Sequence, residues 1–352
     1  MKHLRLSLIG FGVVGQGLAA LLSTKRALLR EHYDLDVTLV SVANARHGFI
    51  YREDGLDIPT LLDLASKRKA LTEHPGVKHW EHALEGMIAT GGDVLAEATA
   101  TNLHDGEPGM SHIRAALSQG MHVITANKGP VALAARELLA LARQNGVQLR
   151  LEATVMAGTP VLSTIREGMA CTRVRAIRGI LNGTTNYILS AMASGRSYEE
   201  VLAEAQSLGY AETDPTADVE GYDAVAKILI LASVIFGHSL KPNQVLRRGI
   251  TSITREQVHQ ALNEGKRIKL IASLQVVGDL EEAPLEARVE PIALAENDPL
   301  AHVDGVMNGI TLQTDTLSSI TIIGPGAGRL ETGQGLLADL IALSRGEVAK
   351  SG

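Results

Sequence analysis

In the first 151 residues of the chain, short apolar runs alternate with longer helix-forming stretches. This alternation is typical of β-α-β units built on a parallel sheet. The expected strands are 4–9, 37–43, 93–101, 121–125 and 147–151, and the expected helices are 16–29, 110–119 and 131–144. Residues 48–92 are expected to form loops and helices.

The pattern changes after residue 172, where apolar and polar residues alternate as they do in half-buried strands. Strands expected at 174–181, 267–277, 285–292 and 310–316 indicate an α+β domain, with a mixed or antiparallel sheet covered by helices on one face. The strand 319–323, the glycine turn 324–328 and the helix 331–344 return to the first pattern. We therefore predict a discontinuous first domain, residues 1–151 and 318–352, and a second domain, residues 152–317.

The composition fits two globular domains. Of the 352 residues, 45% are apolar and 20% are charged, which is sufficient to build two cores. The net charge of −6 gives no general electrostatic surface for nucleic acid, and no run of about 18 uncharged apolar residues is available to span a membrane. Cys171 is the sole cysteine, so we expect no disulfide framework and a reducing, cytoplasmic environment.

A glycine-rich loop joins the first expected strand to the first expected helix. Its residues are Gly10, Phe11, Gly12, Val13, Val14 and Gly15. Gly10 permits the tight turn, Gly12 lets the backbone approach a pyrophosphate, and Gly15 lets the helix pack on the strand. The phosphates are expected at the helix N-terminus, where free N–H groups point at them. The loop predicts a Rossmann-type dinucleotide-binding domain, and the alternative is a glycine turn without a ligand.

The end of the second expected strand indicates which dinucleotide binds. NAD-specific folds usually place an Asp or Glu there to hold the ribose 2′-hydroxyl, whereas this chain has Asn44 and Arg46 and no acid. An arginine can accept a 2′-phosphate, so NADP is favoured over NAD; the alternative is that Arg46 is a solvated loop residue. Thr99 is expected to line the site of the nicotinamide ribose, and Gly328, at the end of the second glycine turn, is also expected to contact the cofactor.

Lys128 lies where the expected strand 121–125 turns into the following helix. In open α/β sheets, ligands bind at the carboxyl ends of the strands. We therefore expect Lys128 to point toward a bound ligand, while the alternative is a solvated loop lysine.

The stretch 205–227, AQSLGYAETDPTADVEGYDAVAK, carries Glu212, Asp214, Asp218, Glu220, Asp223 and Lys227 and runs directly into the apolar segment 228–236. No glycine or proline interrupts the chain from Tyr222 to Phe236, so a helix is expected there. Asp223 and Lys227 lie four residues apart on one face of this helix. A solvated ion pair is the ordinary interpretation, but the helix is too apolar for a surface element, which favours a general acid/base role for Lys227.

This stretch resembles the signature of the homoserine dehydrogenase family at more than ten positions in fixed register, and the run Thr125-Ala-Asn-Lys-Gly-Pro-Val131 resembles the same family. The resemblance implies reversible, NAD(P)-dependent interconversion of L-aspartate 4-semialdehyde and L-homoserine in threonine and methionine biosynthesis. It implies a homodimer or homotetramer whose second domain binds substrate and mediates dimerisation.

The resemblance also implies roles for particular residues. Lys227 would be the proton donor and acceptor, held by Asp223, and Lys128 would polarise the same oxygen or relay the proton. Glu212 would bind the substrate ammonium group, with Asp218 nearby.

The loop 152–160 resembles the family loop that holds a structural monovalent cation, expected to be sodium. The implied ligands are Glu152 and the backbone carbonyl groups of Val155, Ala157 and Thr159. Many relatives continue into a regulatory domain, and because this chain stops at Gly352 we expect the short form without it. Two other functions stay open: a Rossmann dehydrogenase acting on another amino acid or hydroxy acid, and a non-catalytic NADP-sensing protein.

Overall fold

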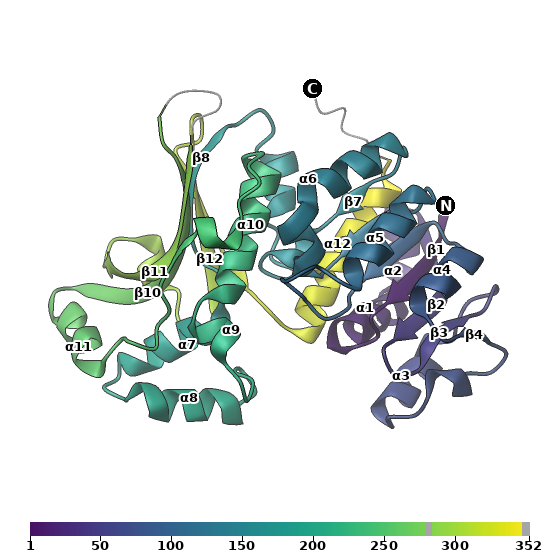
Figure 1. The fold of residues 1–352 in the computed structure, drawn as a ribbon, viewed down its shortest axis with the longest axis horizontal. Coiled ribbons are helices and arrows are strands. Elements are labelled where there is room, and N and C mark those ends of the chain that lie inside the picture. The colour runs from purple at the N-terminus through teal and green to yellow at the C-terminus, as the bar shows by residue number, and fades with distance from the viewer. Residues whose placement is uncertain (279–283, 347–352) are drawn as a thin grey trace. The chain divides into compact units, whose positions relative to one another are not determined.

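The computed structural model describes residues 1–278 and 284–346 and divides into two compact units (Figure 1). One unit comprises Met1–Pro160 and Gly328–Gly352, and the other comprises Val161–Ala327. Residues 347–352 of the expected first domain lie outside the described residues.

The first unit is built on a seven-stranded sheet with the order β4-β3-β2-β1-β5-β6-β7. Its strands are β1 (Lys2–Ile9), β2 (Leu35–Asn44), β3 (Gly48–Tyr51), β4 (Lys78–Trp80), β5 (Val94–Glu97), β6 (His122–Thr125) and β7 (Leu149–Arg150). Strand β1 runs parallel to β2 and β5, and β6 runs parallel to β5 and β7. The parallel, Rossmann-type sheet predicted from the sequence is confirmed.

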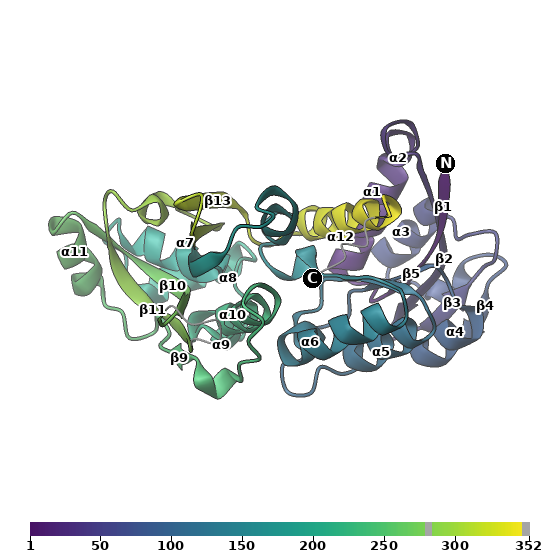
Figure 2. The same cartoon turned by 90° about the horizontal axis from the view of Figure 1, so that it is seen from above.

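Helices cover both faces of this sheet. Figure 2 shows α1 (Val13–Thr24) and α12 (Arg329–Ser344) on one face and α5 (Gly109–Ser118) and α6 (Lys128–Gln144) on the other. Leu6 and Leu8 of β1 are fully buried in one core with Leu18 of α1 and Leu336 and Leu340 of α12. Burial of this apolar surface on both faces is what stabilises a parallel sheet.

Three local predictions for this unit were wrong. The expected helix 16–29 is two helices, α1 and α2 (Arg26–Tyr33), since the Thr24 hydroxyl donates to the carbonyl oxygen of Ala20 and the backbone leaves the helix at Lys25. Residues 48–92 contain not only α3 (Ile58–Ser66) and α4 (Ala83–Thr90) but also two strands that extend the sheet, β3 antiparallel to β2 and β4 antiparallel to β3. The strand expected at 93–101 ends at Glu97.

The second unit is built on a six-stranded sheet with the order β13-β12-β8-β10-β11-β9. Its strands are β8 (Val174–Ile180), β9 (Leu246–Arg247), β10 (Lys266–Val276), β11 (Leu285–Ala295), β12 (Met307–Thr314) and β13 (Ser319–Pro325). Its helices are α7 (Gly183–Met192), α8 (Tyr198–Ser207), α9 (Thr216–Val219), α10 (Tyr222–Ile235) and α11 (Arg255–Asn263). All strand pairs are antiparallel except β9 with β11, so the predicted mixed sheet is confirmed.

Strand β13 corrects the prediction that residues 319–323 would complete the first sheet. It pairs instead with β12, where Ile320 lies opposite Leu312 and Ile322 lies opposite Ile310. Opposed residues of an antiparallel pair point to the same side, so the apolar side chains of both strands share one face. The chain returns to the first unit only at Gly328, and α12 packs there against α1 as expected.

The contact between α1 and α12 depends on glycine. A Cβ atom added at Gly17 would lie 2.0 Å from the carbonyl oxygen of Arg329, and one added at Gly333 would lie 2.8 Å from the carbonyl carbon of Gly17. The two helix backbones therefore approach each other too closely for any side chain at these positions.

We predict that Gly17→Ala lowers the free energy of unfolding by about 1–3 kcal/mol, because the added methyl group forces α1 and α12 apart. Ser23→Ala on the exposed face of the same helix is the matched control and should change stability by less than about 0.5 kcal/mol. Thermal and denaturant unfolding of both variants measure the difference. An unchanged or raised stability for Gly17→Ala would contradict the packing described.

Candidate active site

The glycine loop between β1 and α1 has the geometry of a phosphate-binding turn. Gly10 has φ +104°, and a Cβ atom there would lie 2.3 Å from the carbonyl carbon of Ala98. A Cβ atom at Gly15 would lie 2.2 Å from the carbonyl oxygen of Gly10, so the helix packs directly on the loop. At Gly12 a Cβ atom would meet no described atom within 4 Å, which leaves the backbone open to a ligand.

Helix α1 starts next to this open backbone. Val13 and Val14 form its first turn, Phe11 is held by a bond from its N–H to the carbonyl oxygen of Ala43, and no described side chain caps the N-terminus. Uncapped N–H groups and the helix dipole favour a negatively charged group at this point. The residues present therefore fit the pyrophosphate of a dinucleotide.

The end of β2 is organised by Asn44. Its Oδ1 accepts the N–H groups of Arg46 at 3.0 Å and His47 at 2.7 Å, which folds the chain back into β3. Arg46 is exposed on this turn. No acidic side chain occupies positions 44–47, as the sequence had indicated.

Lys128 is the first residue of α6, directly after the carboxyl end of β6. Asn127 caps the helix, since its Oδ1 accepts the N–H of Gly129 at 3.0 Å, and its Nδ2 donates to the Thr99 hydroxyl at 3.0 Å. Thr99 in turn donates its N–H to the carboxylate of Glu97 at 3.1 Å. The structure thus brings the Thr99 and Lys128 segments together, through Glu97 and Asn127, which the sequence analysis gave no role.

The loop 152–160 carries a buried carboxylate and a run of backbone carbonyl groups. Glu152 and Thr159 are buried, and Met156 and Ala157 both have left-handed backbone, with φ +58° and +53°. A Cβ atom at Gly335 would lie 2.5 Å from the carbonyl oxygen of Ala157. Val155 follows the single turn 152–154 and donates its N–H to the carbonyl oxygen of Glu152. An all-oxygen set with one carboxylate fits a hard cation.

In the second unit, Lys227 is buried, with its side chain 7% exposed, on the first turns of α10. Its Nζ donates to Asp223 Oδ2 at 2.9 Å and to the carbonyl oxygen of Leu181, which immediately precedes the N-cap of α7. The predicted pair on one face of a helix starting at Tyr222 is confirmed. Because a buried ammonium group needs both charge and hydrogen-bond compensation, these contacts fix its position.

Asn182 joins this pair to a second carboxylate. Its Nδ2 donates to Asp218 Oδ1 at 2.7 Å and to Asp223 Oδ2 at 3.0 Å, while its Oδ1 caps α7 by accepting the N–H of Thr185 at 2.9 Å. The sequence analysis gave Asn182 no role. The Asn-Gly-Thr-Thr run at a helix start signals the cap, but nothing local signals the two carboxylates.

Burial raises the pKa of the Asp218 carboxyl above its usual value, and the neighbouring Asp223 raises it further. Hydrogen bonds from Asn182 and Thr184 and the charge of Lys227 act in the opposite direction. Two carboxylates, one ammonium and one amide are therefore packed within hydrogen-bond distance at the start of α7 and α10. A buried carboxyl group with a raised pKa, packed against a second carboxylate and a buried lysine, is typical of an active site.

Glu212 is not part of the hydrogen-bonded cluster around Lys227. It is exposed in the turn before α9, where its backbone carbonyl oxygen accepts a bond from Gln206 Nε2 at 3.2 Å. The structure gives no hydrogen bond between its side chain and the cluster of Asn182, Asp218, Asp223 and Lys227.

A cavity of about 890 Å³ lies elsewhere in the second unit, next to the C-terminal end of α10. Arg166, Phe236 and His238 are among its lining residues, and no member of the Lys227 cluster is. It is therefore separate from the candidate site. Within the described ranges, no cluster of three or more His, Cys, Asp or Glu side chains is arranged to hold a metal ion, and no helix there is long and apolar enough to cross a membrane.

A Rossmann-type unit with an open phosphate loop, combined with a second unit that buries a lysine among carboxylates, defines a dinucleotide-dependent oxidoreductase. Comparison with known proteins gives the family. A model of homoserine dehydrogenase matches residues 160–341, and a model of the homoserine dehydrogenase NAD binding domain matches residues 10–152. The chain belongs to the homoserine dehydrogenase family.

Individual relatives agree along the whole chain. An NAD(+)-dependent homoserine dehydrogenase of Pseudomonas canavaninivorans is 38% identical over 351 residues, 99% of each chain. A homoserine dehydrogenase of Methanocaldococcus jannaschii is 37% identical over 95% of this chain and 96% of that protein.

Solved structures agree as well. That of a homoserine dehydrogenase from Thiobacillus denitrificans has a TM-score of 0.84 at 32% identity, covering 99% of this chain and 75% of that one. A hyperthermophilic archaeal homoserine dehydrogenase mutant in complex with NADPH has a TM-score of 0.85 at 26% identity, covering 99% and 100%. The chain is thus an NAD(P)-dependent enzyme that interconverts L-homoserine and L-aspartate 4-semialdehyde, a step of threonine and methionine biosynthesis.

The raised pKa of Asp218 gives a prediction for stability. Above the pKa that Asp218 has in the folded protein, its carboxylate is ionised in both the folded and the unfolded protein. Because the charge is less favourable in the folded protein, it lowers the free energy of unfolding. This destabilisation disappears as the pH falls from the pKa of the folded protein to that of the unfolded chain. Asp218→Asn should therefore raise the free energy of unfolding at pH 8 by on the order of 1 kcal/mol, and the gain should vanish in acid.

Asp214→Asn is the control with the opposite sign, since hydrogen bonds from the hydroxyl and N–H of Thr216 lower the pKa of Asp214. Asp214→Asn should leave the free energy of unfolding at pH 8 unchanged or lower it. Urea unfolding of both variants from pH 4 to pH 8 tests the pair. A destabilised Asp218→Asn variant at pH 8 would contradict the assignment.

Proposed function

We propose that Lys227 transfers the proton at the reacting oxygen of homoserine and aspartate semialdehyde, with Asp223 holding its side chain in place. The observation that supports this role is the burial of the ammonium group on Asp223 and the carbonyl oxygen of Leu181. In the equally spaced pair of Lys67 and Asp63, by contrast, the lysine side chain is 58% exposed to solvent.

In the oxidation of homoserine, C4 loses a hydride and its hydroxyl group loses a proton. A nicotinamide cofactor, which the glycine loop 10–15 and Thr99 would hold, would supply the acceptor or the donor of this hydride. Neutral Lys227 takes the hydroxyl proton as general base, and in reduction its ammonium group returns a proton to the aldehyde oxygen. Asp223 stabilises the ammonium form and Asn182 keeps Asp223 oriented.

We assign the remaining binding roles to four side chains. Lys128 polarises the reacting oxygen or relays its proton, and Glu212 binds the substrate ammonium group, with Asp218 nearby. Thr99 lines the site of the nicotinamide ribose.

We propose that the enzyme uses NADP in preference to NAD. Arg46, exposed beside Asn44 and without an acidic neighbour at positions 44–47, supports binding of a 2′-phosphate. A hyperthermophilic archaeal homoserine dehydrogenase has been solved in complex with NADPH, whereas the relative from P. canavaninivorans is NAD(+)-dependent. Gly328, the N-cap of α12 with φ +135°, is proposed as a further cofactor contact.

We also propose a structural monovalent cation, sodium, on Glu152 and the carbonyl groups of Val155, Ala157 and Thr159. The buried carboxylate and the two left-handed residues support it. Assembly as a homodimer or homotetramer through the second unit and a cytoplasmic location, supported by the single exposed cysteine, complete the proposal.

We predict that Lys227→Met lowers kcat for homoserine oxidation by about 10²–10⁴-fold, the usual contribution of a positioned acid/base, while cofactor affinity stays near that of the wild type. Lys67→Met removes the exposed lysine of an equally spaced pair, 2.7 Å from Asp63, and should leave kcat unchanged. Steady-state rates with homoserine and NADP measure both. Turnover that survives in Lys227→Met but collapses in Lys128→Met would exchange the two roles.

The cofactor proposal makes a separate prediction. Arg46→Ala should weaken NADP binding by about tenfold or more and leave NAD binding nearly unchanged, because only the 2′-phosphate makes a charge-assisted bond to the guanidinium group. Asn44→Asp keeps the acceptor for the N–H groups of Arg46 and His47 but places an acid at the ribose, so it should shift preference toward NAD. Dissociation constants for NADP and NAD, measured by fluorescence titration of both variants, test these expectations. Equal losses for both cofactors in Arg46→Ala would show that Arg46 does not contact the 2′ position.

A further inference from the structure

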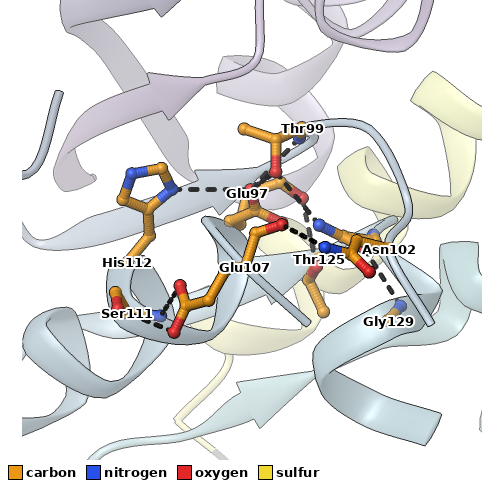
Figure 3. A network of polar contacts seen from close by, with 9 residues as sticks. Glu97, Thr99, Asn102, Glu107, Ser111, His112, Thr125 and Gly129 are labelled. Atoms are coloured by element: carbon orange, nitrogen blue, oxygen red, sulfur yellow. Dashed lines mark hydrogen bonds and ion pairs between the residues drawn. The ribbon is translucent and has the colours of Figure 1, made fainter. Parts of the chain in front are cut away.

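Glu97 is the last residue of β5 and is completely buried. Its Oε1 accepts the N–H of Thr99 at 3.1 Å and also the Thr99 hydroxyl (Figure 3). Neither Glu97 Oε2 nor Nδ1 of the neighbouring His112 has a hydrogen-bond partner among the described residues, and the His112 Nδ1 lies 3.7 Å from Oε1. A buried carboxylate with an unpaired oxygen costs stability, so its presence at a strand end calls for a functional reason.

Two hydrogen-bonded paths lead from Glu97 to Asn127. In the first, Glu97 accepts from Thr99, whose hydroxyl oxygen accepts from Asn127 Nδ2 at 3.0 Å. In the second, the backbone oxygen of Glu97 accepts from the Thr125 hydroxyl at 3.1 Å, and Thr125 Oγ1 accepts the N–H of Asn127 at 3.0 Å. Asn127 is thereby held at its side chain and at its backbone.

Asn127 directly precedes Lys128 and caps the helix that Lys128 begins. The position of the Asn127 side chain therefore fixes the first turn of α6 and, with it, the backbone from which the Lys128 side chain extends. Helix α5 closes this arrangement from the other side, since a Cβ atom at Gly109 would lie 2.5 Å from Asn127 Nδ2 and 3.1 Å from Glu97 Oε2. Neither group has room to shift toward α5.

We infer that Glu97 is a positioning residue, which acts through Thr99 and Asn127 to hold Lys128 where it meets the reacting oxygen. Gly109 must lack a side chain, because a Cβ atom there would displace Asn127. The inference rests on the role proposed above for Lys128. A displacement of about 1 Å at a catalytic group can cost on the order of 100-fold in rate, which sets the size of effect to expect.

The test compares Glu97→Leu and Glu97→Gln, each in the wild-type and in the Lys128→Met background. Glu97→Leu, which has no acceptor for Thr99, should lower kcat about 100-fold. Glu97→Gln keeps an acceptor oxygen and should stay within about threefold of the wild type. If Glu97 acts through Lys128, Glu97→Leu should lower kcat no further once Lys128 is methionine, because residues that act as a unit are not additive.

All rates are measured at saturating homoserine and NADP, so that weaker binding is not counted, and thermal unfolding shows that each variant is folded. Ser111→Ala is the matched control on α5; it removes the hydroxyl that donates to Glu107 Oε1 at 2.9 Å and should leave kcat unchanged. If Glu97→Leu does not fold, Gly109→Ala displaces Asn127 with a single methyl group and should show the same loss and the same dependence on Lys128.

The outcomes separate this inference from the proposed function. A full additional loss in the double variant, or wild-type kcat in Glu97→Leu, would overturn the positioning role of Glu97. Wild-type kcat in Lys128→Met would instead overturn the proposed role of Lys128 itself, on which the inference depends.

Discussion

The buried ion pair between Lys227 and Asp223 is the interaction on which the proposed chemistry of the second unit depends. Removing an ammonium group from water is costly, and here the cost is offset by a carboxylate 2.9 Å away and by the carbonyl oxygen of Leu181. Both partners are fixed by helix ends, because Leu181 precedes the cap of α7 and Asp223 lies in the first turn of α10. Asn182 ties those two ends and Asp218 together, so that one amide orients both carboxylates.

The first unit follows a different constraint, close approach of backbones. Gly10 and Gly15 pack the phosphate loop against β5 and α1, and Gly17 and Gly333 bring α12 against the same helix. The strand ends of β5 and β6 then present Thr99 and Lys128 from a single hydrogen-bonded network. In the proposed function, binding of a dinucleotide relies on positions that lack a side chain, whereas handling of the substrate relies on buried charged side chains.

Features encoded within one or two turns could be predicted from the sequence. The glycine loop, the helix from Tyr222 and the pair of Asp223 and Lys227 depend on spacing alone, and all are present. The contacts of Asn182 could not be predicted, since its two carboxylate partners lie 36 and 41 residues away. The contacts of Glu97 could not be predicted either, because it is simply the last residue of an apolar strand. Strand β13 was assigned to the wrong sheet because the sequence of an apolar strand does not indicate which strand it pairs with. Strands β3 and β4 were missed because they are too short to show a periodic pattern of apolar residues.

A crystal structure of the enzyme with NADP and homoserine bound tests the central claim most directly. The account predicts that Lys227 Nζ lies about 2.6–3.2 Å from the C4 hydroxyl oxygen while still bonded to Asp223, as a general base must. A structure in which Lys227 stays on Asp223 and Leu181 without reaching that oxygen, and Lys128 alone contacts it, would contradict the account.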